Sequence, residues 1–100
     1  MNITRNEQDG KLTLCIDGWL DTMASPELGK EIDSISEVKE LVLDFDKVEY
    51  MASAGLRQVV YAHRKAKELG ASFSVVNVVS GVMSIFKMTG IDKKLNIIAK

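Results

Sequence analysis

The sequence predicts a single α/β domain over residues 1–100, with helices packed on a mixed, mostly parallel sheet. Two observations favour this fold class. Apolar, strand-like runs alternate with segments of helical periodicity, and such alternation favours parallel strands joined by right-handed crossovers. The first two strand-like runs are instead joined by Asp9-Gly10 alone, a hairpin signal that makes one strand pair antiparallel. A chain of 100 residues matches the usual size of one domain with one core.

The hairpin is expected to pair residues 2–8 with residues 11–17, and Gly18 is expected to end the second strand. Alternate residues of that second strand form an apolar face, namely Leu12, Leu14 and Ile16. Cys15 is the only cysteine, so it has no partner for an internal disulfide or a multi-cysteine metal site. We expect it to be a buried thiol, which fits a reducing compartment.

The first helix is expected to begin at Ser25. This serine suits the N-cap, Pro26 suits the first turn, and Glu27 places an acidic group at the positive end of the helix dipole. Apolar residues at helical spacing then share one face: Leu28, Ile32 and Ile35. The later elements are expected as a central strand at 39–46, a helix from Ala54 to a stop at Gly70, a strand at 72–78, a helix at 80–90 and a final strand or extended tail at 94–99.

Composition argues against several classes of function. The net charge of -1 disfavours nucleic-acid binding, because phosphate neutralisation usually requires a basic face. No apolar run approaches the roughly 20 residues of a membrane-spanning helix, so we expect no direct membrane insertion. The first ten residues lack the basic-then-apolar pattern of a signal peptide. We therefore expect a water-soluble, cytoplasmic chain without a targeting segment.

Ser53 lies where the central strand gives way to a helix, in the stretch EYMASAGLRQVV at 49–60. It has three possible roles, as a helix cap, a catalytic nucleophile or a modification site. Serine is among the best N-caps, because its hydroxyl satisfies an unpaired amide of the first turn. The small residues around it allow a tight turn from strand to helix. Cap residues are common, so the cap is the simplest interpretation.

A catalytic role is disfavoured because the partner groups are missing. The segment MASAG resembles the second half of the G-x-S-x-G nucleophile motif, but Met51 stands in place of the first glycine. His63 is the only histidine and lies ten positions after Ser53, roughly 15 Å along the same helix. A hydrolase serine needs a histidine within hydrogen-bond reach. One histidine and one cysteine form no zinc site, and no glycine-rich nucleotide loop is present. We expect neither an enzyme nor a bound cofactor.

A modification at Ser53 is chemically feasible. Free amides and the positive dipole end at a helix start would tolerate a phosphate there. Asp44 and Asp46 bracket Phe45 and are expected to share a face at the end of the central strand. Such a pair suits a divalent ion, although solvating the strand end is its commoner role. A phosphate on Ser53 would place about two further negative charges beside this pair at pH 7 and act as a charge switch.

Three segments match the motifs of one known family in order and spacing. GWLDTMASPEL at 18–28 is similar to a Gly-x-Leu-Asp stretch followed by a helix. LVLDFDKVEYMASAGLRQVV at 41–60 is similar to a strand, an aspartate, a turn and a Ser-x-Gly-Leu helix start. FKMTGID at 86–92 is similar to a late Leu-Thr-Gly-Leu segment. Over nearly its whole length the chain resembles the STAS family, the sulphate-transporter and anti-sigma-factor-antagonist domains.

The resemblance implies a protein-binding regulator that acts by partner switching. The small antagonists of this family bind an anti-sigma factor that is also a serine kinase with a histidine-kinase-like ATP site. The kinase phosphorylates one serine or threonine at this helix start and breaks the complex, and a phosphatase reverses the step. By motif match this residue is Ser53. Asp21 matches the aspartate of Gly-x-Leu-Asp near the same surface, and Asp44 matches the aspartate that ends the central strand.

One position departs from the family pattern. The family usually has Asp directly before the phosphorylated residue, where this chain has Ala52. That carboxylate suits a role in orienting the hydroxyl or contacting the kinase's magnesium. The chain is then either an antagonist with altered regulation or a binder that is never phosphorylated. The family also offers an alternative function, a soluble STAS subunit of a membrane transporter for lipids or anions.

The helix after Ser53 offers further contact residues on its outer face. Arg57 and Tyr61 lie one turn apart, and both residue types are enriched at interaction hot spots. Met83 and Met88 on the late helix are expected to fill the core, unless exposure makes one of them an adaptable contact. The candidate partner-binding residues are therefore Asp21, Asp44, Ala52, Ser53, Arg57 and Tyr61.

Overall fold

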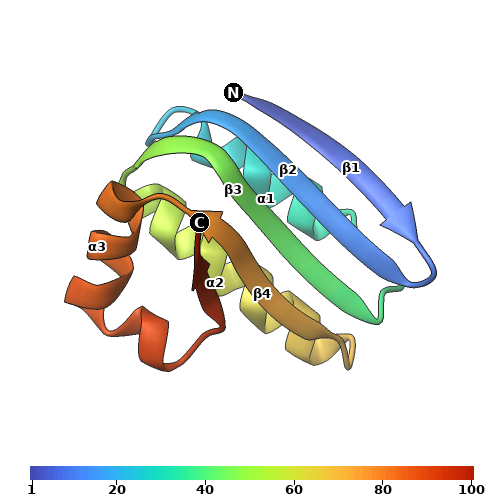
Figure 1. Ribbon diagram of the computed structural model, residues 1–100. Helices are drawn as coiled ribbons and strands as arrows, with labels where there is room; N and C mark the ends of the chain where they lie inside the picture. Colours follow the sequence, from blue (N-terminus) through green and yellow to red (C-terminus); the bar gives the residue numbers. More distant parts are fainter.

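The computed structural model describes residues 1–100 as one five-stranded sheet with three α-helices packed around it (Figure 1). The strands lie in sequence order across the sheet; β1 is antiparallel to β2, and all later neighbours are parallel. The predicted mixed, mostly parallel sheet is confirmed. The elements are β1 (Asn2–Gln8), β2 (Lys11–Leu20), α1 (Ser25–Asp33), β3 (Glu40–Met51), α2 (Ser53–Glu68), β4 (Ser72–Val78), α3 (Ser80–Thr89), a 3-10 turn (Ile91–Lys93) and β5 (Ile97–Ala99).

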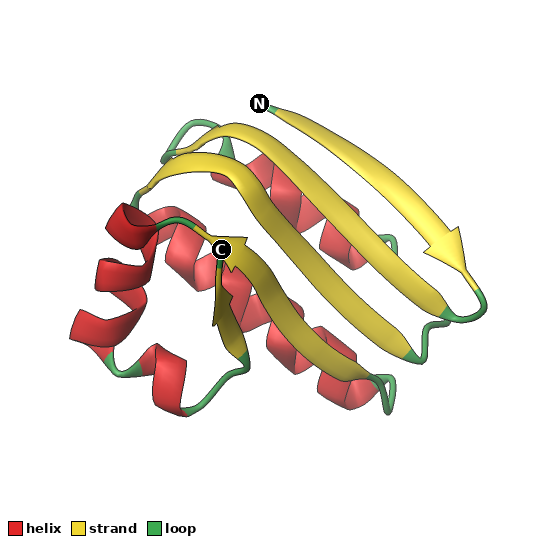
Figure 2. Cartoon of the chain, in the orientation of Figure 1, coloured by secondary structure: helices red, strands yellow, loops and turns green.

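Helices α1 and α2 cover one face of the sheet, and α3 lies beside it near β4 and β5 (Figure 2). One hydrophobic core joins the helices to the inward residues of the strands. Its largest fully buried side chains include Phe45, Phe86, Leu14, Ile16, Leu20 and Leu28. Because β2, β3 and β4 are parallel, the starts of α1, α2 and α3 all lie at one edge of the sheet. We call this edge, where the three strands end, the carboxyl edge.

The Asp9-Gly10 hairpin is confirmed. Asp9 and Gly10 have φ values of 52° and 83°, both positive as a two-residue type I′ turn requires. Gln8 pairs directly with Lys11 on either side of the turn. The local chemistry of the turn therefore sets the register of the first strand pair.

Two strands run further than the sequence predicted. The expectation that Gly18 ends the second strand is wrong, because β2 continues to Leu20. Gly18 adopts a φ of 121°, and the register with β3 shifts between Cys15 and Asp17 and again between Gly18 and Trp19. Strand β2 thus accommodates Gly18 as an irregularity in the register and stays paired with β3. Strand β3 likewise continues past residue 46 to Met51.

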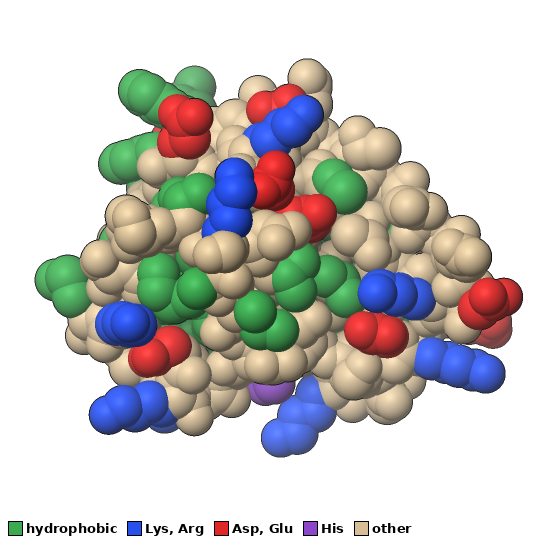
Figure 3. Space-filling model, viewed as in Figure 1, with side chains coloured by type: hydrophobic (Ala, Val, Ile, Leu, Met, Phe, Trp, Pro, Cys, Tyr) green, Lys and Arg blue, Asp and Glu red, His purple; other side chains and the backbone are tan.

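The second face of the sheet carries no helix, and Figure 3 views the molecule from this side. Its residues alternate with the core residues of each strand. They include Thr13 and Cys15 of β2, Val42 and Asp44 of β3, and Ser74 and Val76 of β4. Figure 3 shows several hydrophobic patches on this face, with acidic and basic side chains between and around them.

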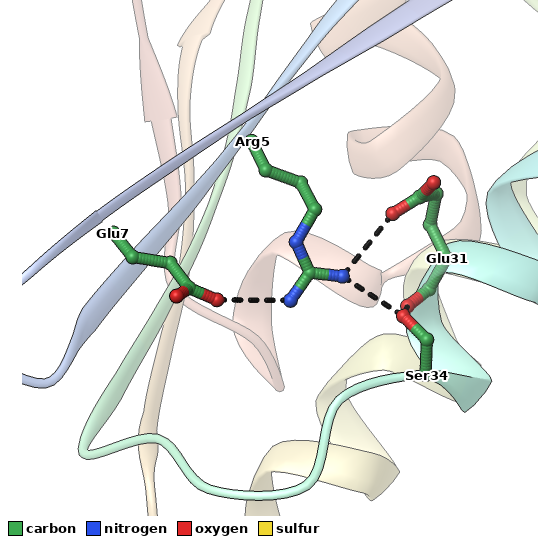
Figure 4. A network of polar contacts seen from close by, with 4 residues as sticks. All are labelled: Arg5, Glu7, Glu31 and Ser34. Carbon is green, nitrogen blue, oxygen red and sulfur yellow. Dashed lines mark hydrogen bonds and ion pairs between the residues drawn. The ribbon is translucent and has the colours of Figure 1, made fainter.

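Arg5 ties the edge strand β1 to helix α1 (Figure 4). Its Nη1 donates to Glu31 Oε2 at 3.2 Å and to Ser34 Oγ at 2.8 Å, and its Nη2 donates to Glu7 Oε1 at 3.0 Å. These hydrogen bonds, with the Glu7 bond foremost, raise the pKa of Arg5 above its ordinary value. The network holds the outer strand against the helix layer, since β1 has a strand neighbour on one side only.

Candidate partner-binding site

The turn that carries Ser53 lies at the carboxyl edge between β3 and α2. Ala52 has the extended backbone of an N-cap, with φ −87° and ψ 171°, and Ser53 is the first helical residue. The Ala52 N–H donates to the Leu20 carbonyl at 2.9 Å. Gly55 packs against the same residue, because a Cβ there would lie 2.6 Å from Leu20 Cγ and 2.7 Å from Leu20 O. The turn is therefore fixed to the end of β2, directly before Asp21.

The Ser53 hydroxyl is exposed and has no hydrogen-bond partner. The prediction that Ser53 caps the helix is wrong, because the cap position is Ala52, whose methyl group accepts no hydrogen bond. The backbone N–H groups of Ser53, Ala54 and Gly55 have no acceptor, and the first turn carries no acidic side chain. The start of α2 thus presents a free hydroxyl beside three free amides at the positive end of the helix dipole.

Supplying the missing cap should stabilise the domain. Ala52→Ser places an acceptor at the cap position and should raise the free energy of unfolding by about 1 kcal/mol. Ser53→Ala is the paired control and should change it by less than about 0.5 kcal/mol, because the exposed hydroxyl is unbonded. Urea denaturation measures both. A loss of about 1 kcal/mol in Ser53→Ala would mean that Ser53 is the cap after all.

Asp21 orders the segment between β2 and α1 at this edge. Its Oδ1 accepts the Ala24 N–H at 2.8 Å, and its carbonyl oxygen accepts the Ser25 N–H at 3.0 Å and the Ser25 hydroxyl at 2.6 Å. The prediction that Ser25 caps α1 is wrong, because Ala24 holds that position and Ser25 is buried behind it. The buried serine instead fixes the chain that presents Asp21.

Asp44 lies away from the carboxyl edge. Since β3 continues to Met51, Asp44 is in the middle of the strand, on the helix-free face. Its Oδ1 accepts the Asp46 N–H at 3.0 Å and the Asn77 side-chain amide at 3.1 Å. The extended chain from Asp44 to Ala52 spans roughly 26 Å. The expectation that a phosphate on Ser53 would lie beside the two aspartates is therefore wrong.

Arg57 and Tyr61 line a groove between α1 and α2. Arg57 is exposed one turn after Ser53 and forms no ion pair. Tyr61 is a further turn away, roughly 12 Å from Ser53 along the helix axis. Its hydroxyl donates to the Asp33 carboxylate of α1, and this hydrogen bond is the main cause that raises the pKa of Tyr61. Tyr61 thus joins the two helices, whereas Arg57 remains free beside the turn.

Cys15 and His63 take no part in this site. Cys15 is half-buried on the helix-free face, where burial and then the charge of Asp44 raise the pKa of its thiol and Lys47 opposes them. The His63 ring packs edge-on against Phe73 with the ring centroids 5.5 Å apart. Met83 fills the core as expected, whereas Met88 is 86% exposed.

The carboxyl edge also carries an exposed aromatic pair that the sequence motifs do not identify. Trp19 and Tyr50 are 62% and 48% exposed, face each other in the register of β2 and β3, and have ring centroids 5.5 Å apart. Strand alternation is the signal that could have revealed them. Leu20 and Met51 are core residues, so the residue before each points away from the core.

Comparison with known proteins places this arrangement in a family. The family model described as the STAS domain matches residues 2–100. The chain belongs to the STAS family. This STAS domain is 25% identical to BtrV of Bordetella bronchiseptica over 92 residues, which cover 90% of this chain and 79% of BtrV. BtrV is assigned as an anti-sigma factor antagonist.

Solved structures share the fold of this STAS domain. An anti-sigma factor antagonist from Mycobacterium paratuberculosis has a TM-score of 0.84 at 24% identity, covering 99% of this chain and 86% of that one. Unphosphorylated SpoIIAA has a TM-score of 0.81 at 17% identity, covering 96% and 87%. Phosphorylated SpoIIAA of Bacillus has a TM-score of 0.75 at 15% identity, covering 96% and 90%. The STAS domain has no helix that is long and apolar enough to cross a membrane.

Proposed function

We propose that this STAS domain is an anti-sigma factor antagonist that binds its partner through the carboxyl edge around Ser53. Phosphorylation of Ser53 releases the partner, and a phosphatase restores the binding form. The anti-sigma factor is itself the serine kinase. The observation that carries the proposal is the exposed, unbonded Ser53 hydroxyl beside the free amides at the start of α2.

The relatives support this proposal. BtrV is assigned as an anti-sigma factor antagonist, and SpoIIAA has been solved with and without its phosphate. A fold that accommodates both states suits a reversible switch. The absence of an acidic side chain in the first turn of α2 also favours an anion at Ser53.

The chemistry of the switch is a phosphoryl transfer to Ser53. The Ser53 oxygen forms a bond to the γ-phosphorus of ATP, the bond from that phosphorus to the β–γ bridging oxygen breaks, and ADP leaves. A base of the kinase takes the hydroxyl proton. The product carries about two negative charges at pH 7, and the free amides of α2 can donate hydrogen bonds to it. The fold survives, but the partner surface now faces a charge that is costly to bury.

Ser53→Asp should weaken binding to the purified anti-sigma factor by at least tenfold, about 1.4 kcal/mol, while leaving thermal stability nearly unchanged. Binding weakens because the new carboxylate would be unpaired at the centre of the interface. Ser53→Ala should keep wild-type affinity. Isothermal titration calorimetry measures the three affinities, with the anti-sigma factor identified by pull-down from the source cell and mass spectrometry.

Ser36→Asp is the matched control. Ser36 is an exposed serine between α1 and β3, at the opposite edge of the sheet, so its substitution adds the same charge away from the proposed site. It should bind like wild type. Equal affinity of wild type and Ser53→Asp would rule out the switch. Capture of transporter permease or ATPase subunits in place of an anti-sigma factor would support the alternative function.

Substitutions at position 52 test whether Ala52 lowers the rate at which Ser53 is phosphorylated. Ala52→Asp restores the acid that the family usually places before the phosphorylated residue, so it should speed phosphorylation of Ser53 by the purified kinase. Ala52→Asn is the control, because it supplies a helix cap with neither the charge nor a second hydroxyl. Incorporation of radiolabelled phosphate gives the rates. Equal phosphorylation rates in both variants would show that any gain over wild type comes from the helix cap and not from the charge.

A further inference from the structure

We infer that the exposed pair Trp19–Tyr50 is the hydrophobic anchor of the partner surface. It packs against an apolar surface of the anti-sigma factor that carries arginine or lysine side chains at its margin. This inference rests on the proposed function and adds to it the residues that supply most of the binding free energy. The pair lies on the strands, whereas the modification lies on the helix.

The pair is exposed, and its two rings pack against each other. Trp19 is the only tryptophan of the chain, and it is 62% exposed although its neighbour Leu20 is fully buried. The Trp19 and Tyr50 rings contact each other at a tilt of 50°, on adjacent and paired strands. Tryptophan and tyrosine side chains have only two χ angles and lose little conformational entropy on binding. Tryptophan and tyrosine are also the residue types most enriched at interaction hot spots.

The size of a stable interface requires an anchor beyond the serine turn. Specific interfaces bury about 800 Å² on each partner. Ala52, Ser53 and Ala54 are small and supply little of this area. The aromatic pair is continuous with them, because Tyr50 precedes Ser53 by three residues and the Ala52 N–H is bonded to Leu20, the residue after Trp19. Phosphate on Ser53 would therefore lie within the surface that the pair anchors.

The charges around the pair define the chemistry of its partner. Three carboxylates flank it along the chain and form no ion pair, those of Asp17, Asp21 and Glu49. Two cations lie near the pair along the sheet, Lys47 opposite Asp17 and the amino group of Met1 beside Gly18, and Arg57 lies beyond the serine turn on α2. Figure 3 shows hydrophobic and acidic side chains together where β2 and β3 end. An arginine or lysine of the partner could meet both the carboxylates and the aromatic ring faces.

The single tryptophan permits a direct test. The chain is labelled with 5-fluorotryptophan, which places one fluorine signal at Trp19, and is titrated with the unlabelled purified anti-sigma factor. The fluorine resonance should shift or broaden in step with binding measured by calorimetry. Trp19→Ala and Tyr50→Ala should each weaken binding at least roughly 30-fold, the size expected of a hot spot. Met88→Ala, which truncates a still more exposed apolar side chain near the end of α3, should change affinity less than about twofold.

The possible outcomes separate the inference from the proposed function. Binding by the wild-type chain without a change in the fluorine signal would overturn the anchor and leave the function intact. A signal that changes with the concentration of the labelled chain alone would assign the pair to contacts between two copies and also overturn it. No binding of the anti-sigma factor by the wild type would overturn both. Melting temperatures close to wild type confirm that the variants are folded.

Discussion

Gly55→Ala is expected to lower the free energy of unfolding by about 2–3 kcal/mol, although alanine is the better helix former. The added Cβ would lie 2.6 Å from Leu20 Cγ and 2.7 Å from Leu20 O. That carbonyl oxygen is bonded to the Ala52 N–H, so relief of the clash must separate the start of α2 from the end of β2. The same shift would move Ser53 away from Asp21. We therefore expect weaker partner binding as well, measured by urea denaturation and calorimetry.

Gly81→Ala is the matched control for this substitution. Gly81 lies in helix α3, and a Cβ there would meet no atom within 4 Å. The change should raise the free energy of unfolding by up to about 1 kcal/mol, because alanine loses less backbone entropy than glycine. A gain of stability in both variants would show that the contact between α2 and β2 is loose enough to admit a methyl group.

Phe45→Ala is expected to lower the free energy of unfolding by about 3–5 kcal/mol. Phe45 is fully buried in the central strand β3, and its ring lies 6.3 Å from the ring of Phe86 on α3. The substitution removes contacts on the sheet and on α3 at once and leaves a cavity. Domains of this size are stable by about 5–15 kcal/mol, so the loss is a large share of the total. Calorimetry should show a melting temperature lower by roughly 12 °C or more.

Phe73→Ala on the neighbouring strand β4 gives the comparison. It removes the same atoms, but Phe73 is only partly buried and packs against His63. The resulting loss should be clearly smaller, about half as large, since less apolar area returns to water. Equal losses would indicate that Phe45 is not at the centre of the core.

Local sequence chemistry determined the elements of this fold. Asp9-Gly10 specifies its turn because both residues adopt a positive φ at little cost. The apolar spacing placed Leu28 and Ile32 on the buried face of α1, and Ile35 is buried just after the helix ends. The alternation of strands and helices led to the parallel sheet, and the quoted motifs led to the STAS family. Each of these features depends on residues that are close together in the chain.

Strand ends and helix caps depended on the tertiary structure. Pairing with β3 carries β2 through Gly18, because hydrogen bonds across the sheet outweigh the preference of glycine for a turn. The longer β3 places Asp44 in the middle of the sheet, although its position in the motif suggested the site. The contact of Ala52 with Leu20 makes Ala52 the cap, in place of the chemically better Ser53.

The candidate site itself combines both kinds of information. Ser53, Ala52 and Asp21 were found from their motifs, because a family pattern records chemistry at fixed spacing. The Trp19–Tyr50 pair could not be found in this way, since its members are 31 residues apart and meet only through the register of β2 and β3. Register is a property of the whole packed sheet, because the buried face must match across every strand. The sequence by itself therefore determined the elements, the family and the serine, and only the tertiary structure decided which surface surrounds that serine.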